Sequence, residues 1–185
     1  LRAPSILISG DSGAVQGSAV LQIASQEGQI VASSDSINLS TLASNIKDAA
    51  PVFAALKPSG RASFSAKATL RSNLAPLIDA SVTPKDVGVT LSGGEQVTKL
   101  SGLVKATGAS DNLTVSTQAL SFSYQNAPLK LDAALVVSPK GVDVTTLNIK
   151  GFGGQISLPA KLTQGKPGTL TVQPSAASIQ LEPLM

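Results

Sequence analysis

Apolar and polar residues alternate with a period of two along most of this chain. The alternation is clearest in residues 61–71, where the apolar positions are Ala62, Phe64, Ala66, Ala68 and Leu70. Successive side chains of a β-strand point to opposite faces of a sheet, so these residues share one face and the polar residues between them share the other. The segment is predicted as a half-buried antiparallel strand.

The same alternation recurs in several further segments, namely 87–91, 100–106, 113–124, 129–137, 142–149 and 156–162. Residues typical of turns separate them: Pro84 with Gly88, Gly93-Gly94, Gly108 with Asp111-Asn112, Asn126 with Pro128, Pro139 with Gly141, and Gly165 with Pro167-Gly168. About nine strands joined by short turns predict a mainly β fold built on a meandering antiparallel sheet.

One segment follows a helical period instead. Its apolar residues are spaced by three and four, at Leu39, Leu42, Ile46, Ala49, Phe53 and Leu56. Asn38 is the expected N-cap, with Ser36 as the alternative. Pro51 lacks an amide hydrogen and would clash with the preceding turn, so we expect one kinked amphipathic helix or two short helices that meet there.

The chain also resembles itself. Residues 8–21 (ISGDSGAVQGSAVL) align without a gap to residues 149–162 (IKGFGGQISLPAKL), and residues 33–43 align to 175–185 after one inserted residue. Chance agreement between segments of limited variety is the alternative, but the matched pieces keep their order. We therefore expect residues 1–185 to be a single fragment of about one repeat period, with one repeat start at about 6–56 and the next at about 147–185.

Composition and charge narrow the possible functions. The chain is 42 % hydrophobic but only 3 % aromatic, so its apolar surface is built from small aliphatic side chains. It contains no His and no Cys, which disfavours acid–base catalysis, thiol chemistry and metal binding. We expect no enzyme activity, no catalytic residue, no metal and no cofactor.

The net charge of +3 comes largely from five basic residues in one stretch, at Lys47, Lys57, Arg61, Lys67 and Arg71. Stacking aromatics and a recognition helix are absent from it, so we expect a solvated face and no nucleic-acid partner. The GDSG sequence at 10–13 echoes a serine-protease loop, but without a histidine base it is predicted as a turn between strands. The same holds for GFGG at 151–154, which lacks the residues of a phosphate loop.

Spaced glycines and leucines in residues 10–42 and 100–184 resemble the strand series of the AsmA-like proteins of Gram-negative bacteria, relatives of the TamB-type periplasmic β-groove proteins. The resemblance implies a curved antiparallel meander that forms an open groove or half-barrel. It also implies a periplasmic protein, anchored in the inner membrane, whose concave side carries phospholipid toward the outer membrane. Because Leu1 is not an initiator Met, we expect the anchor in an N-terminal segment that this sequence lacks.

Two functions follow from these observations. The first is a lipid-binding and lipid-transport groove for phospholipid acyl chains, with candidate lining residues Phe64, Leu70, Leu131, Leu135, Ile149, Ile156 and Leu162. The second is a structural or adhesive β-repeat domain with a closed core. The low aromatic content and a helix too small to cover the strands favour the groove. Exposed edge strands could also pair between copies of the fragment.

Overall fold

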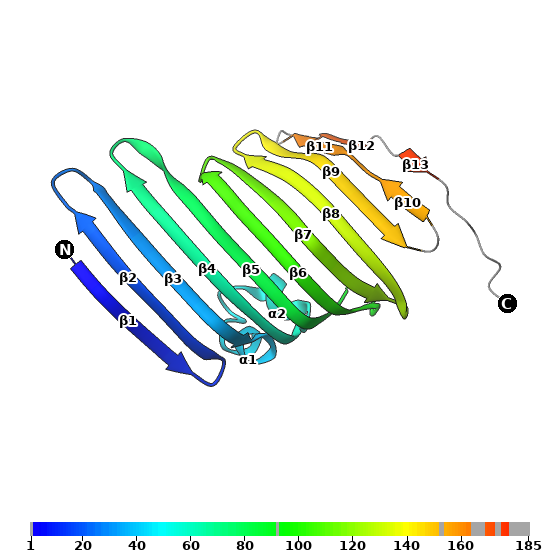
Figure 1. Cartoon of the computed structure of the whole chain (residues 1–185), viewed down its shortest axis with the longest axis horizontal. Helices are drawn as coiled ribbons and strands as arrows, with labels where there is room; N and C mark the ends of the chain where they lie inside the picture. Colours follow the sequence, from blue (N-terminus) through cyan, green and yellow to red (C-terminus); the bar gives the residue numbers. More distant parts are fainter. Residues whose placement is uncertain (1, 92, 152–153, 164–168, 173–174, 178–185) are drawn as a thin grey trace.

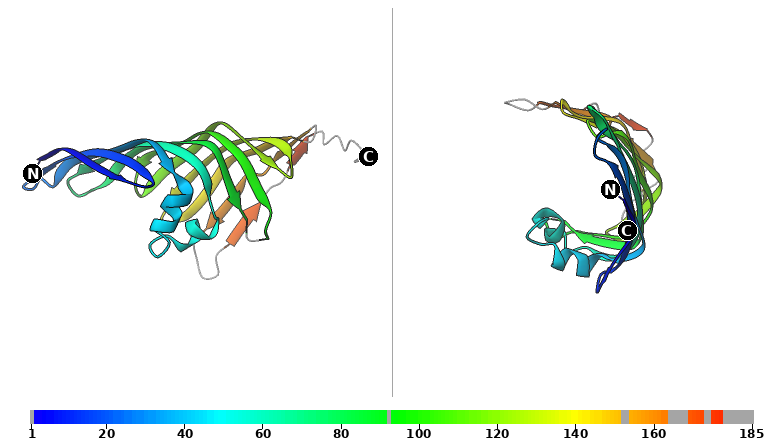
Figure 2. Two further views of the ribbon diagram at one scale, coloured as in Figure 1. Left: turned by 90° about the horizontal axis from the view of Figure 1, so that it is seen from below. Right: turned by 90° about the vertical axis from the view of Figure 1, so that its left-hand side faces the viewer.

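The chain folds into one curved antiparallel sheet with two short helices against one rim (Figure 1). The computed structural model describes the backbone of residues 2–91, 93–151, 154–163, 169–172 and 175–177, and side chains up to residue 160. The sheet is not closed into a barrel, and seen along its length it forms an arc (Figure 2). The expected fold class, mainly β with a curved antiparallel meander sheet that forms an open groove or half-barrel, is therefore confirmed, with two short helices where one kinked amphipathic helix was expected.

Ten strands follow one another in the sheet in the order of the sequence. They are β1 (Arg2–Gly10), β2 (Gly13–Gln22), β3 (Glu27–Asn38), β4 (Ser59–Arg71), β5 (Leu74–Thr90), β6 (Gln96–Ala109), β7 (Asn112–Tyr124), β8 (Ala127–Ser138), β9 (Gly141–Gly151) and β10 (Gly154–Ser157).

Three shorter strands complete the described part of the sheet: β11 (Ala160–Thr163), β12 (Thr169–Val172) and β13 (Ser175–Ala177). Both β10 and β11 pair with β9, so they form one neighbouring strand that is interrupted between them. Pro159 lies in this gap and has no amide hydrogen to give to the ladder. The sequence predicted a continuous strand over 156–162, and the proline divides it.

The pairing register sorts side chains onto two chemically different faces. One row of directly paired residues runs from β1 to β9 and ends on β11, and it is entirely apolar: Ile6, Gly17, Ala32, Ala66, Ala80, Ala106, Val115, Leu135, Val144 and Ala160. The next row on this face is also apolar, from Ala3 through Ala19, Ile30, Ala68, Ile78, Gly108, Leu113 and Val137 to Val142. We call this side the apolar face.

The opposite side, the polar face, carries the charged strand residues. A typical row contains Lys67 opposite Asp79, followed by Thr107 and Thr114. Every Lys, Arg, Asp and Glu at a paired position of the described ladder has the register of this face. The alternation predicted for residues 61–71 is confirmed, because Phe64 pairs with Val82 and Ala66 with Ala80 on the apolar face.

A line of β-bulges curls the sheet. Register shifts occur between Ser34 and Ile37 on β3, between Val82 and Val87 on β5, and between Ser116 and Leu120 on β7, all in the half of each strand nearer the helices. A bulge bends its strand and increases the local twist. The strand ends therefore turn toward the apolar face and make the arc that Figure 2 shows.

The curled region holds most of the buried apolar side chains in the described residues. The buried ones are Ile37, Ala43, Val87, Leu120, Leu129 and Ala133, together with Pro58 and Pro84. Three of them, Ile37, Val87 and Leu120, directly follow a bulge. No large side chain among those that the structure describes is fully buried, so this part of the fold is held together by the strand ladder and a small core rather than by a closed interior.

The helical segment forms two short helices, which is the second of the two forms expected from the sequence. The first, α1 (Leu39–Asn45), starts at Asn38, whose side chain accepts hydrogen bonds from the amides of Ser40 (3.1 Å) and Thr41 (3.3 Å). Asn38 is thus the N-cap, as predicted. The second, α2 (Pro51–Ala55), has Pro51 at its first position, where a missing amide hydrogen is tolerated.

One expected turn is wrong. Pro84 and Gly88 were predicted to separate two strands, but both lie inside β5, which runs from Leu74 to Thr90. The bulge that follows Val82 takes the place of a turn, with Asp86 at a φ of 51°. The turn expected at Gly165 with Pro167 and Gly168 lies outside the described residues.

Candidate functional site

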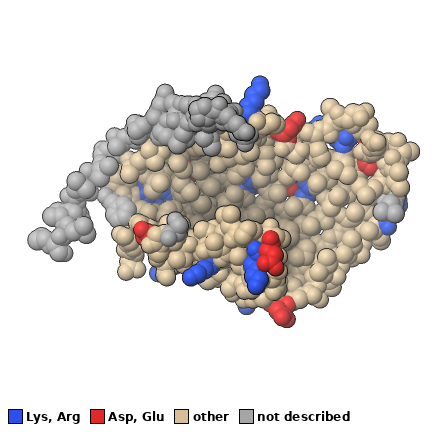
Figure 3. Space-filling view, turned by 180° about the vertical axis from the view of Figure 1, so that it is seen from behind, with Lys and Arg blue, Asp and Glu red and all other residues tan. Residues whose placement is uncertain are grey.

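The concave side of the sheet is a long trough (Figures 2 and 3). Figure 3 shows this side hollowed and largely free of charged residues, which gather at its rims. Since the register sends the charged strand residues to the other face, the concave side is the apolar face. The trough is therefore floored by aliphatic side chains and glycine.

The candidate lining residues lie along this trough and do not converge on one spot. Leu131, Ile149 and Ile156 are direct ladder partners on β8, β9 and β10. Phe64 and Leu70 lie on β4, four strands before β8, a separation of roughly 19 Å at the usual spacing between strands. Leu135 belongs to the apolar row that runs from Ile6 on β1 to Ala160 on β11. Leu162 pairs with Val142, but its side chain lies outside the described residues.

Other residues of the trough that sequence reasoning did not choose are also well exposed. The exposed fractions of Val82, Ile30 and Val137 are 43 %, 42 % and 38 %. The central positions Ala66, Ala80 and Ala106 are small, so the floor lies close to the backbone there. The predicted alternation included Ala66, Ala106 and Val137, but Ile30, Ala80 and Val82 lay outside the predicted segments, and only the register between strands shows that all six belong to one face.

Two hydroxyl groups on the apolar face, those of Thr117 and Ser34, are hydrogen-bonded to the backbone. Thr117 on β7 accepts a hydrogen bond from the amide of Ala133 (2.8 Å) and donates one to the carbonyl of Leu131 (3.3 Å). Ser34 on β3 donates to the carbonyl of Ala14 (2.6 Å). Both residues lie next to bulges, where the ladder is interrupted, so their polar atoms fill gaps in the ladder and add little polarity to the trough.

The helices cover only one rim of the trough. Helix α1 contacts β3 and β4, and Figure 2 shows both helices at the same lower edge of the arc. The side chain of Val52 on α2 is 78 % exposed, so this residue does not pack against the trough. Over the described residues, the rest of the concave side has no second layer of strands or helices above it.

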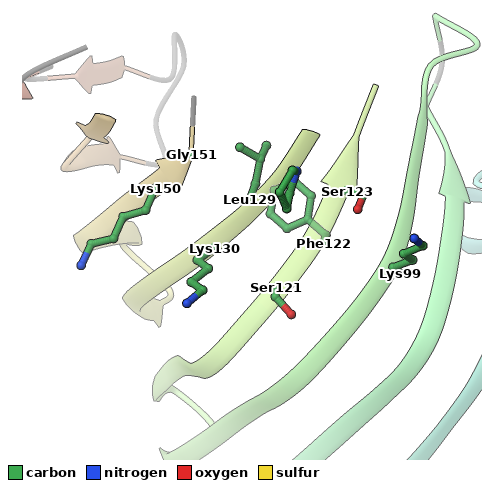
Figure 4. A pocket seen from close by; sticks show the side chains of 9 residues that line it. Lys99, Ser121, Phe122, Ser123, Leu129, Lys130, Lys150 and Gly151 are labelled. Carbon is green, nitrogen blue, oxygen red and sulfur yellow. The ribbon is translucent and has the colours of Figure 1, made fainter. Parts of the chain in front are cut away.

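A separate pocket lies on the polar face near the strand ends of β6, β7, β8 and β9 (Figure 4). It has a volume of about 550 Å³ and is lined by Lys99, Ser121, Phe122, Ser123, Pro128, Leu129, Lys130, Lys150 and Gly151. Lys130 is the direct ladder partner of both Ser121 and Lys150. Sequence reasoning missed this pocket, because its lysines are far apart in the chain.

The described residues offer no group of three or more His, Cys, Asp or Glu side chains that could hold a metal ion. Within the same part of the chain, neither helix has the length and apolar character that crossing a bilayer requires.

The fold and the trough define a class, an open single-layer β-groove with a mainly apolar concave face. Comparison with protein-family models, with curated proteins and with solved structures returns no match to this chain.

Proposed function

We propose that the chain is a lipid-binding groove module that holds phospholipid acyl chains along its concave face. The observation that supports this most is the pair of apolar rows, which cross the sheet from β1 to β9 without a charged side chain. Large apolar surfaces left open on a protein mark sites of interaction. An acyl chain is a ligand that such a surface fits.

Burial of methylene groups would supply the affinity. Each methylene removed from water contributes about 0.8 kcal/mol, so the affinity would rise with the length of acyl chain in contact with the trough. Charged groups lie on the other face and at the rims, so the trough itself would discriminate little between lipid headgroups.

The wider setting of this proposal comes from the resemblance to AsmA-like proteins. From this resemblance we propose a periplasmic protein of a Gram-negative bacterium, anchored in the inner membrane in its full-length form, with a role in phospholipid traffic and outer-membrane biogenesis. The repeated segments are compatible with such an array: residues 8–21 contain the hairpin with Gly10 paired to Gly13, and residues 149–162 contain the one with Gly151 paired to Gly154. The repeat itself stays a prediction.

The test compares neighbouring residues on opposite faces of β8. Leu135 lies on the apolar face and Ala134, the next residue back along β8, lies on the polar face, paired with Ser116 and Thr146. Leu135→Asp places a carboxylate against the acyl chain, where its desolvation is costly, so co-purified phospholipid should fall by about tenfold or more. Ala134→Asp should leave the phospholipid content unchanged. Lipid extraction and mass spectrometry of the chain purified from a Gram-negative periplasm measure both.

Circular dichroism shows that each variant is folded before its lipid content is compared. The proposal is contradicted if the wild-type chain carries no phospholipid, or if the two variants lose it equally. The alternative, a structural or adhesive repeat with a closed core, expects no lipid in the wild type. It also expects unfolding of the Leu135→Asp variant, because the charge would then enter a dry interior.

A further inference from the structure

Three lysines from three strands surround the pocket on the polar face. Lys99 lies on β6, Lys130 on β8 and Lys150 on β9, and Figure 4 shows Ser121 and Ser123 of β7 between the lysines of β8 and β9 and that of β6. All three lysine side chains are exposed, so they can reach a ligand without first losing their hydration to the protein interior.

The pocket holds an excess of positive charge. Lys130 and Lys150 are directly opposite each other in the ladder, an arrangement that destabilises a sheet when the two charges are alike. Among the described residues the lining contains no carboxylate. The acidic residue nearest in the ladder, Asp132, lies two positions along β8, opposite Asn148, and lines an adjoining cavity of about 370 Å³.

The geometry points to a binding site for a phosphate-bearing ligand. Lysine ammonium groups and serine hydroxyls are donors, and phosphate oxygens accept several such hydrogen bonds at once. A bound anion would also neutralise the repulsion between Lys130 and Lys150. The volume of about 550 Å³ exceeds that of a phosphate group alone, so the pocket has room for an organic portion of the ligand.

The phosphate could belong to a lipid headgroup or to a free anion in solution, and the experiment separates these sources. The site is on the face opposite the trough, so it does not depend on the proposed function. The pocket could fail to bind phosphate while acyl chains still bind to the concave side. Equally, the pocket could bind phosphate when no acyl chain binds to the trough.

The test uses the full chain and the double variant Lys130→Gln with Lys150→Gln. Binding of inorganic phosphate is measured by isothermal titration calorimetry, and binding to vesicles of phosphatidylglycerol or of phosphatidylcholine is measured by flotation. Each charged hydrogen bond lost should weaken binding by about tenfold or more. The matched control is Lys67→Gln with Lys105→Gln, which removes two exposed charges from the same face outside the pocket.

Saturable phosphate binding that the pocket variant loses and the control keeps supports a site for free phosphate. Binding of phosphatidylglycerol vesicles without binding of inorganic phosphate, with the same difference between variants, supports a site for lipid headgroups. The inference is overturned if neither probe binds the wild-type chain, or if the pocket variant and the control weaken binding equally.

Discussion

Single residues with unusual backbone angles set the curvature of this sheet. Gly102 on β6 has a φ of 135°, and a Cβ atom built there would lie 2.6 Å from the Cα of Leu120 across the bulge of β7. Ala119, on that bulge, has a φ of 50°. Glycine accepts the first conformation because it has no side chain, whereas an alanine in the left-handed region is held there by its neighbours.

Replacement of Gly102 tests whether this close approach matters. Gly102→Ala should lower the free energy of unfolding by about 2 kcal/mol, because the new methyl group meets backbone atoms and φ becomes strained. Urea denaturation followed by circular dichroism measures the change. The control is Gly10→Ala, where a Cβ would meet nothing within 4 Å, and equal losses in both variants would contradict the explanation.

At the scale of elements, local sequence predicted strands and caps well. The period of two in residues 61–71 matched β4, and the helical spacing together with Pro51 predicted the break between α1 and α2. Both signals act over a few residues, so a single sequence contains them. The candidate lining residues on β4 and β8 were chosen from the same alternation, and the register places them on one face.

Features that join distant strands could not be predicted. The position of a bulge depends on the partner strand, and neither Ala119 nor Lys99, whose φ is 56°, marks a left-handed backbone by its residue type. The bulge after Val82 was therefore not predicted, and Pro84 and Gly88 were interpreted as a turn instead. The pocket between Lys99, Lys130 and Lys150 was missed for the same reason, since it exists only once the register is fixed.

The cap of α1 gives a prediction at this scale. Asn38→Ala removes the acceptor for the amides of Ser40 and Thr41 and should destabilise α1 by about 1 kcal/mol. Hydrogen exchange followed by mass spectrometry should then show faster exchange over residues 39–45 while β5 to β8 are unchanged. Asn38→Asp retains an acceptor and should exchange like the wild type. Unaltered exchange of α1 in the alanine variant would refute the role of the cap.

At the scale of the molecule, the described residues form a single layer with an exposed edge. Strand β1 pairs only with β2 in the described sheet, and Leu7 and Ile8 on it are 69 % and 66 % exposed. An apolar edge strand with unpaired backbone groups is a template for another strand. Association of copies through β1 is therefore expected for this chain, and by itself it would not define a biological assembly.

A charge on the edge tests this association. Leu7→Lys should lower the fraction of dimer or higher species, because a lysine on an edge strand opposes pairing with a second copy. Light scattering coupled to size-exclusion chromatography measures the mass. The control is Thr114→Lys, which adds the same charge to the polar face of the interior strand β7. Equal masses for the wild type and the Leu7→Lys variant would rule out the edge as the contact.

The unbroken apolar rows have a consequence for motion. A hydrocarbon tail lying across the strands would meet almost the same surface after each step of about 4.8 Å from one strand to the next. No side chain in these rows is charged, so none would hold the hydrocarbon tail at one position by an ionic contact. An acyl chain in such a trough would therefore diffuse from strand to strand over low energy barriers. Its residence time at any one strand would be short.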